Sequence, residues 1–170
     1  MITVRPNLLR IDGMFLGFGQ TDDFWSQVSR TGNADDCWIW QGERSRSGHG
    51  CFRPQYRTGP GRRLWAHRIA YMLSTGQQLG KGLCVRHTCG LACCCNPFHL
   101  IAGTPAQNRA DYRRHKALEE ALSESDRQTI KRCNVSVGTL VRRFGITPGI
   151  VWSIRYGKPG ARHANLKQAA

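Results

Sequence analysis

Hydrophobic positions near the start of the chain predict one helix after a weakly patterned segment. Residues 1–20 mix apolar side chains with several glycines, and we expect an arm or an edge strand there. Thr21 is followed by two aspartates, a combination typical of a helix start with threonine as the N-cap. Phe24, Trp25 and Val28 would form the buried face of this helix.

The next part of the chain predicts a hairpin and then a second helix. Residues 36–42 alternate bulky and other side chains as a short strand does, and residues 51–53 are expected to form the returning strand. The Gly-Pro-Gly sequence at residues 59–61 predicts a turn. Apolar residues recur at helical spacing over residues 64–73, and Gly76 lies just past the expected end of this helix.

Two further elements would carry polar residues with catalytic potential. Residues 80–86 predict a short strand that ends at His87. Thr104-Pro105 predicts a helix start, because threonine caps helices and proline fits the first turn, and this places Asn108 about one turn into the helix on the side of His87. His67, in the preceding helix, is more simply explained as a structural hydrogen-bonding residue than as a catalytic one.

The C-terminal part predicts three short helices and a tail. The helices are expected at residues 126–132, 137–144 and 147–156, and Gly145-Ile146 would make a tight turn between the last two. This arrangement indicates a helix-turn-helix, with a plain helical cap as the alternative. Residues 158–170 are expected to form a basic, disordered tail.

The charge of the chain indicates a polyanionic partner. It has 25 Lys and Arg against 11 Asp and Glu, a net charge of +14, and nucleic acid is the usual partner of such a protein. Between Glu43 and Asp111 there is no acidic residue but there are ten basic ones, and Arg127 to Ala170 again lacks acids. A catalytic metal in the central span must therefore use neutral ligands, which weighs against the two-metal nucleases that hold their ions with several carboxylates.

The sequence gives no sign of a membrane or of export. No apolar run approaches the roughly 18 residues of a spanning helix, and Met1–Arg10 lacks the apolar core of a signal peptide. We therefore expect a cytoplasmic protein. In a reducing compartment clustered cysteines are more often metal ligands than disulfides, although the eight cysteines could pair in an exported protein.

Residues 87–99 contain four cysteines and two histidines, a density that a packing core does not need. Cys89, Cys94 and His99 are separated by four residues each, and Pro97 would fix the turn before His99. Cysteine and histidine side chains at such spacing can converge on zinc, which is held in structural sites by four ligands.

Two choices of zinc ligand remain open from the residues alone. The fourth ligand must come from elsewhere, and Cys37 and Cys51 are the candidates. Because Cys93 and Cys95 flank Cys94, the assignment among the three stays open, and the Cys-x-x-x-Cys spacing of Cys89 and Cys93 is also sterically possible.

The chain from Asp36 to His115 resembles a known nuclease family. It is similar to the zinc-containing HNH endonucleases of phages, which are closely related to the His-Cys box homing endonucleases and share their ββα-metal core. The matching motifs are DCWIWQG, GHGCF, AHRIAY and VRHTCGLACCCNPFHLIAGTPAQNRAD. The spacing also matches that of the His-Cys box. One residue separates His87 from Cys89, four separate Cys89 from Cys94, four separate Cys94 from His99, and eight separate His99 from Asn108.

This resemblance implies roles for individual residues. His87 would be the general base that activates water, and Asn108 would bind a single catalytic Mg²⁺. A structural Zn²⁺ would be held by Cys37, Cys89, Cys94 and His99. Family members also place an arginine of the preceding hairpin near the scissile phosphate, for which the candidates here are Arg53, Arg57, Arg62 and Arg63. The chain departs from the family pattern at Gly90, where an acidic residue is usual, and in its three consecutive cysteines before Asn96.

The resulting expectation is an α+β protein with a ββα-metal nuclease core and a helix-turn-helix of the kind appended to many phage HNH proteins. The expected divisions are an arm at 1–20, the HNH nuclease domain at 21–118, the helix-turn-helix at 119–157 and the tail at 158–170. The expected DNA-binding residues are Arg62, Arg63, Arg113, Arg142, Arg143, Thr147, Ser153, Arg155 and Tyr156.

The expected function is metal-dependent hydrolysis of double-stranded DNA, in the host cytoplasm if the protein is phage-encoded. The alternative is a zinc-containing DNA-binding or regulatory protein that does not cleave. Dimerisation leaves no motif in the sequence, and a homodimer stays open.

Overall fold

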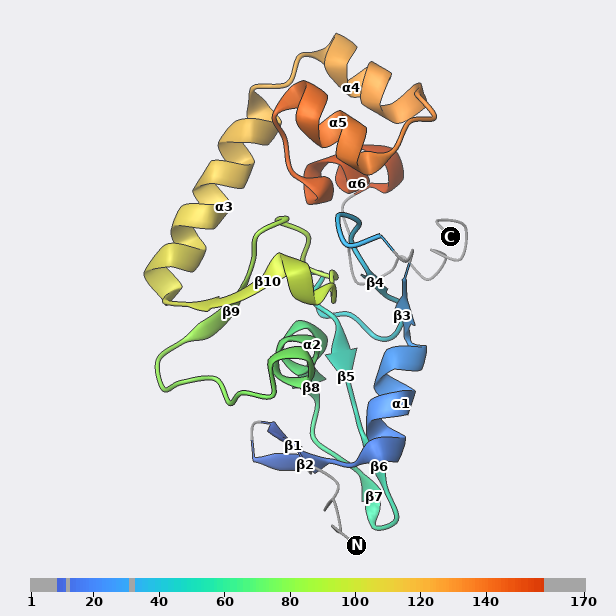
Figure 1. Ribbon diagram of the computed structural model, residues 1–170, viewed down its shortest axis with the longest axis vertical. Helices are drawn as coiled ribbons and strands as arrows, with labels where there is room; N and C mark the ends of the chain where they lie inside the picture. The colour runs from blue at the N-terminus through green and yellow to red at the C-terminus, as the bar shows by residue number, and fades with distance from the viewer. Residues whose placement is uncertain (1–8, 12, 31–32, 158–170) are drawn as a thin grey trace, which may run out of the picture.

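A hairpin of two strands lies at mid-height in Figure 1, and a long helix runs from it along the left edge of the view toward α4. The strands are β9 (Cys84–His87) and β10 (Leu100–Gly103), which pair antiparallel with His87 opposite Leu100. Helix α3 (Pro105–Glu120) follows, and its N-cap Thr104 accepts a hydrogen bond from the backbone of Gln107, as the sequence predicted. The order β9, β10, α3 is a ββα arrangement. The computed structural model describes residues 9–11, 13–30 and 33–157.

Helix α2 (Ala66–Thr75) packs against both strands of this hairpin. It buries Ala66, Ile69, Ala70 and Met72 and ends at Gly76, whose φ of 67° is in the left-handed region that glycine tolerates best. The predicted helix is therefore confirmed, but its first two residues form strand β8 (Leu64–Trp65) instead.

The remaining strands are short and pair as antiparallel two-residue or three-residue ladders. They are β1 (Leu9–Ile11) with β2 (Met14–Leu16), β3 (Val28–Ser29) with β4 (Ile39–Trp40), β5 (Cys51–Phe52) with β8, and β6 (Gln55–Tyr56) with β7 (Gly59–Pro60). The expected return of residues 51–53 onto the strand at 36–42 was therefore wrong, because each pairs with a different partner. The turn expected at 59–61 lies instead at Arg57-Thr58, and Gly59 is part of β7.

Helix α1 (Phe18–Ser26) begins earlier than the sequence predicted. Gly17 is its N-cap, and the Gln20 side chain accepts a hydrogen bond from the Gly17 backbone at 3.0 Å. Thr21, the predicted N-cap, lies inside the first turn and donates to the Gly17 carbonyl. Phe24 is buried as expected, whereas Val28 belongs to β3.

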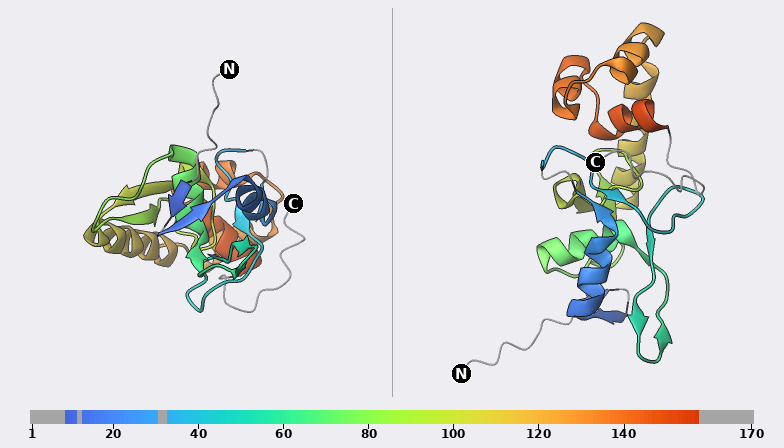
Figure 2. Two further views of the ribbon diagram at one scale, coloured as in Figure 1. Left: turned by 90° about the horizontal axis from the view of Figure 1, so that it is seen from below. Right: turned by 90° about the vertical axis from the view of Figure 1, so that its right-hand side faces the viewer.

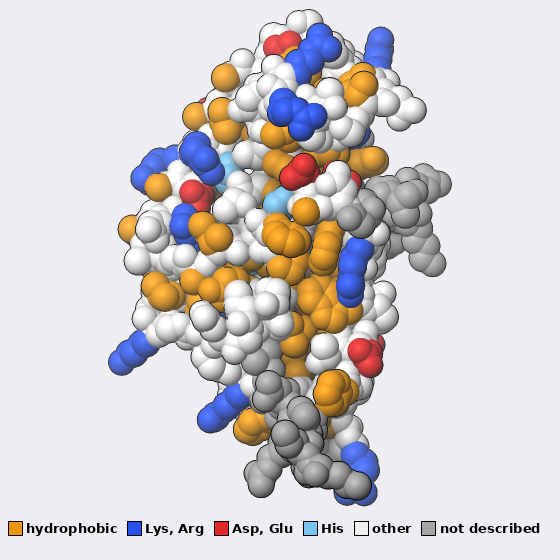
Figure 3. Space-filling model, in the orientation of Figure 1, with side chains coloured by type: hydrophobic (Ala, Val, Ile, Leu, Met, Phe, Trp, Pro, Cys, Tyr) orange, Lys and Arg blue, Asp and Glu red, His pale blue; other side chains and the backbone are white. Residues whose placement is uncertain are grey.

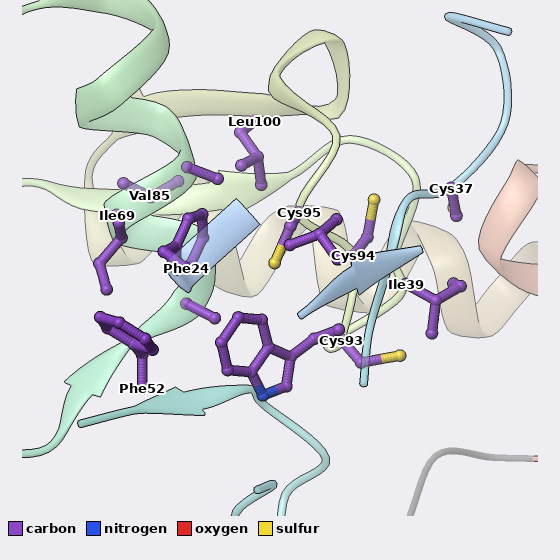
Figure 4. Close-up of a cluster of buried hydrophobic side chains, with 14 of the residues drawn as sticks. Phe24, Cys37, Ile39, Phe52, Ile69, Val85, Cys93, Cys94, Cys95 and Leu100 are labelled. Atoms are coloured by element: carbon purple, nitrogen blue, oxygen red, sulfur yellow. The ribbon is translucent and has the colours of Figure 1, made fainter. Parts of the chain in front are cut away.

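The main core joins the N-terminal segment to the central hairpin (Figure 4). Phe24, Trp40 and Phe52 pack with ring centroids 5.3 to 6.0 Å apart. Ile11 and Leu16, which fall in the expected arm, are fully buried in the same core. The described residues of that segment are thus part of the folded domain.

A helical module occupies one end of the molecule, opposite the β6–β7 hairpin (Figure 2). It consists of α4 (Glu124–Arg132), α5 (Val137–Phe144) and α6 (Pro148–Tyr156), close to the predicted ranges. Its own core comprises Ile130, Leu140, Ile146, Ile150 and Val151. The predicted tail at 158–170 lies outside the described residues. Within the described part of the chain, no helix combines the length and the hydropathy that a membrane crossing needs.

Candidate functional site

Four buried side chains converge on a point that fits a zinc ion. The ligand atoms of Cys37, Cys89, Cys94 and His99 all lie within 4.8 Å of one another. The Cys37 and Cys94 sulfurs lie 3.7 and 3.6 Å from Nδ1 of His99. Zinc–ligand bonds of about 2.0–2.3 Å in a tetrahedron separate the ligand atoms by about 3.5–3.8 Å. The geometry therefore matches a closed structural zinc site.

Backbone pairing brings Cys37 to the cysteine loop. Strand β4 runs beside this loop, with Trp40 N donating to Cys93 O at 2.9 Å and Cys95 N donating to Trp38 O at 2.7 Å. The fourth ligand precedes this strand, so the same hydrogen bonds that attach β4 place Cys37 over the site. Cys51, the other candidate, lies in β5 and is absent from the group of convergent ligands.

Only the middle one of the three consecutive cysteines belongs to the site. Figure 4 shows the sulfurs of Cys93, Cys94 and Cys95 pointing in different directions. Cys93 and Cys95 are fully buried among apolar residues. Burial raises the pKa of Cys93 to about 11 and raises that of Cys95 well above its usual value, so both remain neutral thiols.

Asn96 fastens the zinc loop to the segment before β4. Its side-chain oxygen accepts from Phe98 N at 3.0 Å and caps the short helix η1 (Pro97–His99). Its amide group donates to the carbonyls of Ala34 and Asp36 at 2.7 and 2.6 Å. Asn96 therefore shapes the turn of the zinc loop, and none of these contacts involves His87.

His87 has the tautomer and charge of a general base. Its Nε2 lies 3.1 Å from the carbonyl oxygen of Cys94, and because a carbonyl only accepts, Nε2 carries the proton. Nδ1 then has a free lone pair. Burial lowers the pKa of His87 below its ordinary value of 6.5, which keeps the ring neutral at pH 7.

Asn108 lies in the first turn of α3, with its side chain exposed to solvent. None of the residues of α3 is fully buried, and its Leu118, near the C-terminal end, packs against the core of the helical module rather than against β9. Near Asn108 the helix is therefore not held by a buried apolar face. Polar contacts hold it instead: Asp111 forms an ion pair with Arg86 of β9, and Nε2 of His115 lies 3.0 Å from Thr88 O. These contacts fix the helix that carries Asn108 to the strand that carries His87.

Asp111 was not identified as a site residue from the sequence. The available signal was its place as the first acidic residue after the long acid-free span. Its partner cannot be read from the chain, because the ion pair joins residues that are 25 positions apart.

Two further histidines that the sequence did not assign to the site lie beside His87. The ring centroids of His49 and His67 are 5.9 and 4.9 Å from that of His87, and 5.2 Å from each other. Nδ1 of His67 is buried without a partner, so this atom does not make the structural hydrogen bond that the sequence predicts for the residue. The only sequence signal for His49 is the Gly-His-Gly motif.

The candidate arginines of the hairpin region lie in different places. Arg57 is in the turn of the β6–β7 hairpin, at the lower end of the view in Figure 1, and Arg53 follows β5. Arg62 and Arg63 precede β8. Arg63 pairs with Glu43 at 3.6 Å and stacks on Trp65, which in turn contacts His49.

The helical module contacts the zinc loop directly. Gly149 in the first turn of α6 donates its N–H to the carbonyl of Cys89 at 3.1 Å, and Trp152 belongs to the main core. The turn that a recognition helix would offer to a DNA groove is therefore largely buried here. Arg155 donates to the carbonyls of Ile130, Cys133 and Val135, which places it at the end of α4.

The other residues expected to bind DNA differ in exposure. Thr147 and Ser153 are half-buried and Tyr156 is exposed. Arg113 of α3 and both Arg142 and Arg143 of α5 are exposed.

Gly149→Ala is expected to destabilise the protein by about 2–3 kcal/mol, because a Cβ there would lie 2.3 Å from the Cys89 carbonyl oxygen. Gly138→Ala is the matched control in α5, where the nearest atoms are 3.5 and 3.8 Å away, and it should change stability by no more than about 1 kcal/mol. Urea unfolding of both variants checks this. Equal midpoints for the two would contradict the close contact of α6 with the zinc loop.

Comparisons with known proteins agree with this geometry. The sequence pattern of the family described as HNH endonuclease matches residues 64–110, a range that includes His67, His87 and Asn108. Protein 2.8 of Escherichia phage T7 is 32% identical over 136 residues, which cover 78% of this chain and 88% of that protein. Protein 7.7 of the same phage is 27% identical over 126 residues, 71% of this chain and 92% of its own length. No solved structure matches the chain.

Proposed function

The chain belongs to the HNH endonuclease family, and from this premise we propose that it is a Mg²⁺-dependent DNA endonuclease with His87 as general base. One observation carries the proposal. His87 is neutral, has its Nε2–H committed to the Cys94 carbonyl, and lies on the strand to which the helix of Asn108 is anchored. DNA binding alone would not require this arrangement.

In the proposed reaction Nδ1 of His87 accepts a proton from a water molecule. The resulting hydroxide forms a bond to phosphorus, the bond from phosphorus to the 3′ oxygen breaks, and the 3′ oxygen leaves and takes a proton from a solvent water. The Cys94 carbonyl stabilises the histidinium that forms, because it accepts the hydrogen bond from Nε2.

The residues near Asn108 fit a single magnesium ion. Mg²⁺ prefers oxygen ligands, keeps several waters and often completes its shell with substrate phosphates. The exposed Asn108 offers one oxygen, and the nearby carboxylate of Asp111 is already paired with Arg86. When bound, the ion would neutralise charge on the phosphate and on the leaving oxygen.

The zinc has a structural role in this proposal. Its four ligands are buried, which leaves no open position for water or substrate. By fixing Cys89 and Cys94, the zinc would hold the loop whose carbonyl orients His87.

The substrate is proposed to be double-stranded DNA. On the face seen in Figure 3, Lys and Arg side chains gather over α3 and over the helical module. The exposed Arg113, Arg142 and Arg143 can each contact a phosphate, and we propose that they hold the backbone of the substrate. We propose that the helical module stabilises the zinc loop in addition to contacting DNA, because α6 packs on that loop.

The test is incubation of zinc-loaded protein with supercoiled plasmid in Mg²⁺, in Ca²⁺ and in EDTA. Nicking or linearisation that requires the divalent ion is expected. The alternative, a zinc-containing DNA-binding protein without activity, predicts retardation of the same plasmid with no broken strand under any of these conditions. That outcome, with the zinc retained, would refute the proposed function.

A further inference from the structure

A loop before β5 brings a second histidine into contact with His87. His49 comes from this loop, His67 from α2 and His87 from β9, so three separate elements contribute one ring each. Their centroids are 4.9 to 5.9 Å apart. The three rings form a histidine cluster, which we define as His49, His67 and His87.

The histidine cluster makes the fold less stable than apolar side chains in the same positions would. Nδ1 of His67 is buried without a hydrogen-bond partner, which leaves the desolvation of this polar atom uncompensated. An apolar side chain would fill the same space without this cost. His67 is only 8% exposed and packs against both of the other rings, so we expect it to support them rather than to contact substrate.

The loop of His49 has a closely fixed conformation. Gly48 has a φ of 84°, which disfavours other residues, and a Cβ on Gly50 would lie 2.6 Å from Trp40 and 2.8 Å from Ala66. Glycine is therefore favoured at position 48 by the backbone conformation and at position 50 by the close packing of Trp40 and Ala66.

A chain of serine hydroxyls ends on the His49 ring. Ser45 Oγ lies 2.9 Å from Ser47 Oγ, which lies 3.0 Å from Nδ1 of His49. When the Ser47 hydroxyl donates to Nδ1, Nε2 carries the ring proton. Among the described residues this Nε2 has no hydrogen-bond partner, and the side chain is only half-buried. His49 can thus present an N–H donor next to the general base.

We propose that His49 is a further catalytic residue, whose Nε2–H donates to a non-bridging oxygen of the scissile phosphate while His87 takes the proton from the attacking water. This inference rests on the proposed nuclease function. The attacking water and a non-bridging oxygen of one phosphate are about 3 Å apart, so two rings separated by 5.9 Å can reach both. The donor becomes most effective as negative charge develops on the phosphate oxygens.

The experiment begins by mapping a cleaved site with the wild-type protein and placing it in a synthetic duplex. Single-turnover and steady-state rates are then compared for wild type, His49→Ala, His49→Phe and His49→Gln. His49→Phe keeps a ring against Trp65 and His67 but removes the donor, so it remains informative if the alanine variant fails to fold. Removal of an oxyanion donor should lower kcat about 100-fold, with KM changed less than about threefold. The glutamine variant should recover part of the loss.

A phosphorothioate at the cleaved position tests the contact itself. If His49 had only a structural role, its replacement would not change the effect of the sulfur on the cleavage rate. Sulfur in place of one non-bridging oxygen should slow the wild type, and this effect should shrink in His49→Phe. Arg46→Ala is the control, because Arg46 is exposed on the same loop and should alter salt dependence without altering kcat.

The outcomes separate the two proposals. A wild type that binds but never cleaves refutes the nuclease function and this inference with it. A cleaving wild type whose kcat is unchanged in His49→Phe refutes only the role of His49. A fall in kcat with an unchanged sulfur effect also contradicts the proposed contact.

Discussion

Cys94→Ala is expected to release the zinc ion and to unfold the loop between β9 and β10. Cys94 is one of the four buried ligands of the proposed zinc site. Its sulfur lies 3.6 Å from Nδ1 of His99, which would bind the same ion. Structural zinc sites contribute about 10–16 kcal/mol of apparent binding energy in small domains, which equals or exceeds the whole stability of most proteins. The variant should therefore contain no stoichiometric zinc and should lack a cooperative thermal transition.

Cys93→Ala is the matched control, because it removes the same atom from the adjacent and equally buried residue. It should cost about 1–2 kcal/mol through the small cavity that it leaves, and it should keep one zinc per chain. Metal analysis and thermal unfolding of the two purified variants decide the point. Zinc retained in Cys94→Ala but lost from Cys93→Ala would shift the ligand assignment by one residue, and zinc retained in both would refute a site at this position.

Asn108→Ala is expected to reduce cleavage by about 100-fold or more at saturating DNA, because it would remove the protein ligand of the catalytic metal. Its stability should change by less than about 0.5 kcal/mol, since the side chain is exposed. Rates measured across a Mg²⁺ titration check this expectation. The loss should persist at high Mg²⁺ if Asn108 also positions the ion.

Two companion variants make the Asn108 result specific. Asn108→Asp keeps an oxygen ligand and should retain more activity, at a lower Mg²⁺ requirement, because the ligand gains a charge. Arg109→Ala changes the next exposed residue of α3 and should weaken DNA binding without changing the Mg²⁺ dependence. If Asn108→Ala and Arg109→Ala behave alike, Asn108 only contacts DNA.

The zinc site was predictable because its spacing is local. Three of its ligands lie within eleven residues, and the turn between them is set by Asn96 and Pro97. The choice of Cys37 over Cys51 depended on which strand pairs with the cysteine loop, and strand pairing over some 55 positions leaves no local signal. The helix start at Thr104 was equally local, and it was predicted correctly.

Most of the features that the sequence did not predict depend on long-range packing. The histidine cluster joins residues from a loop, a helix and a strand, and a lone histidine in each carries little information. The hydrogen bond between Gly149 and Cys89 could not be predicted either, because nothing in the sequence around Gly149 distinguishes it from an ordinary residue of a short helix. The start of α1 is a local exception: propensity favours Thr21 as the N-cap, but the N-cap is Gly17, whose backbone N–H donates to the Gln20 side chain.

His87 is the residue that we propose activates water for DNA cleavage. The most direct test is the single-turnover cleavage rate of wild type and His87→Ala on the same DNA, with both proteins shown to contain one zinc per chain and to bind DNA equally. Loss of a general base should slow the reaction by about 100-fold to 10,000-fold. Equal rates for the two proteins would contradict the account.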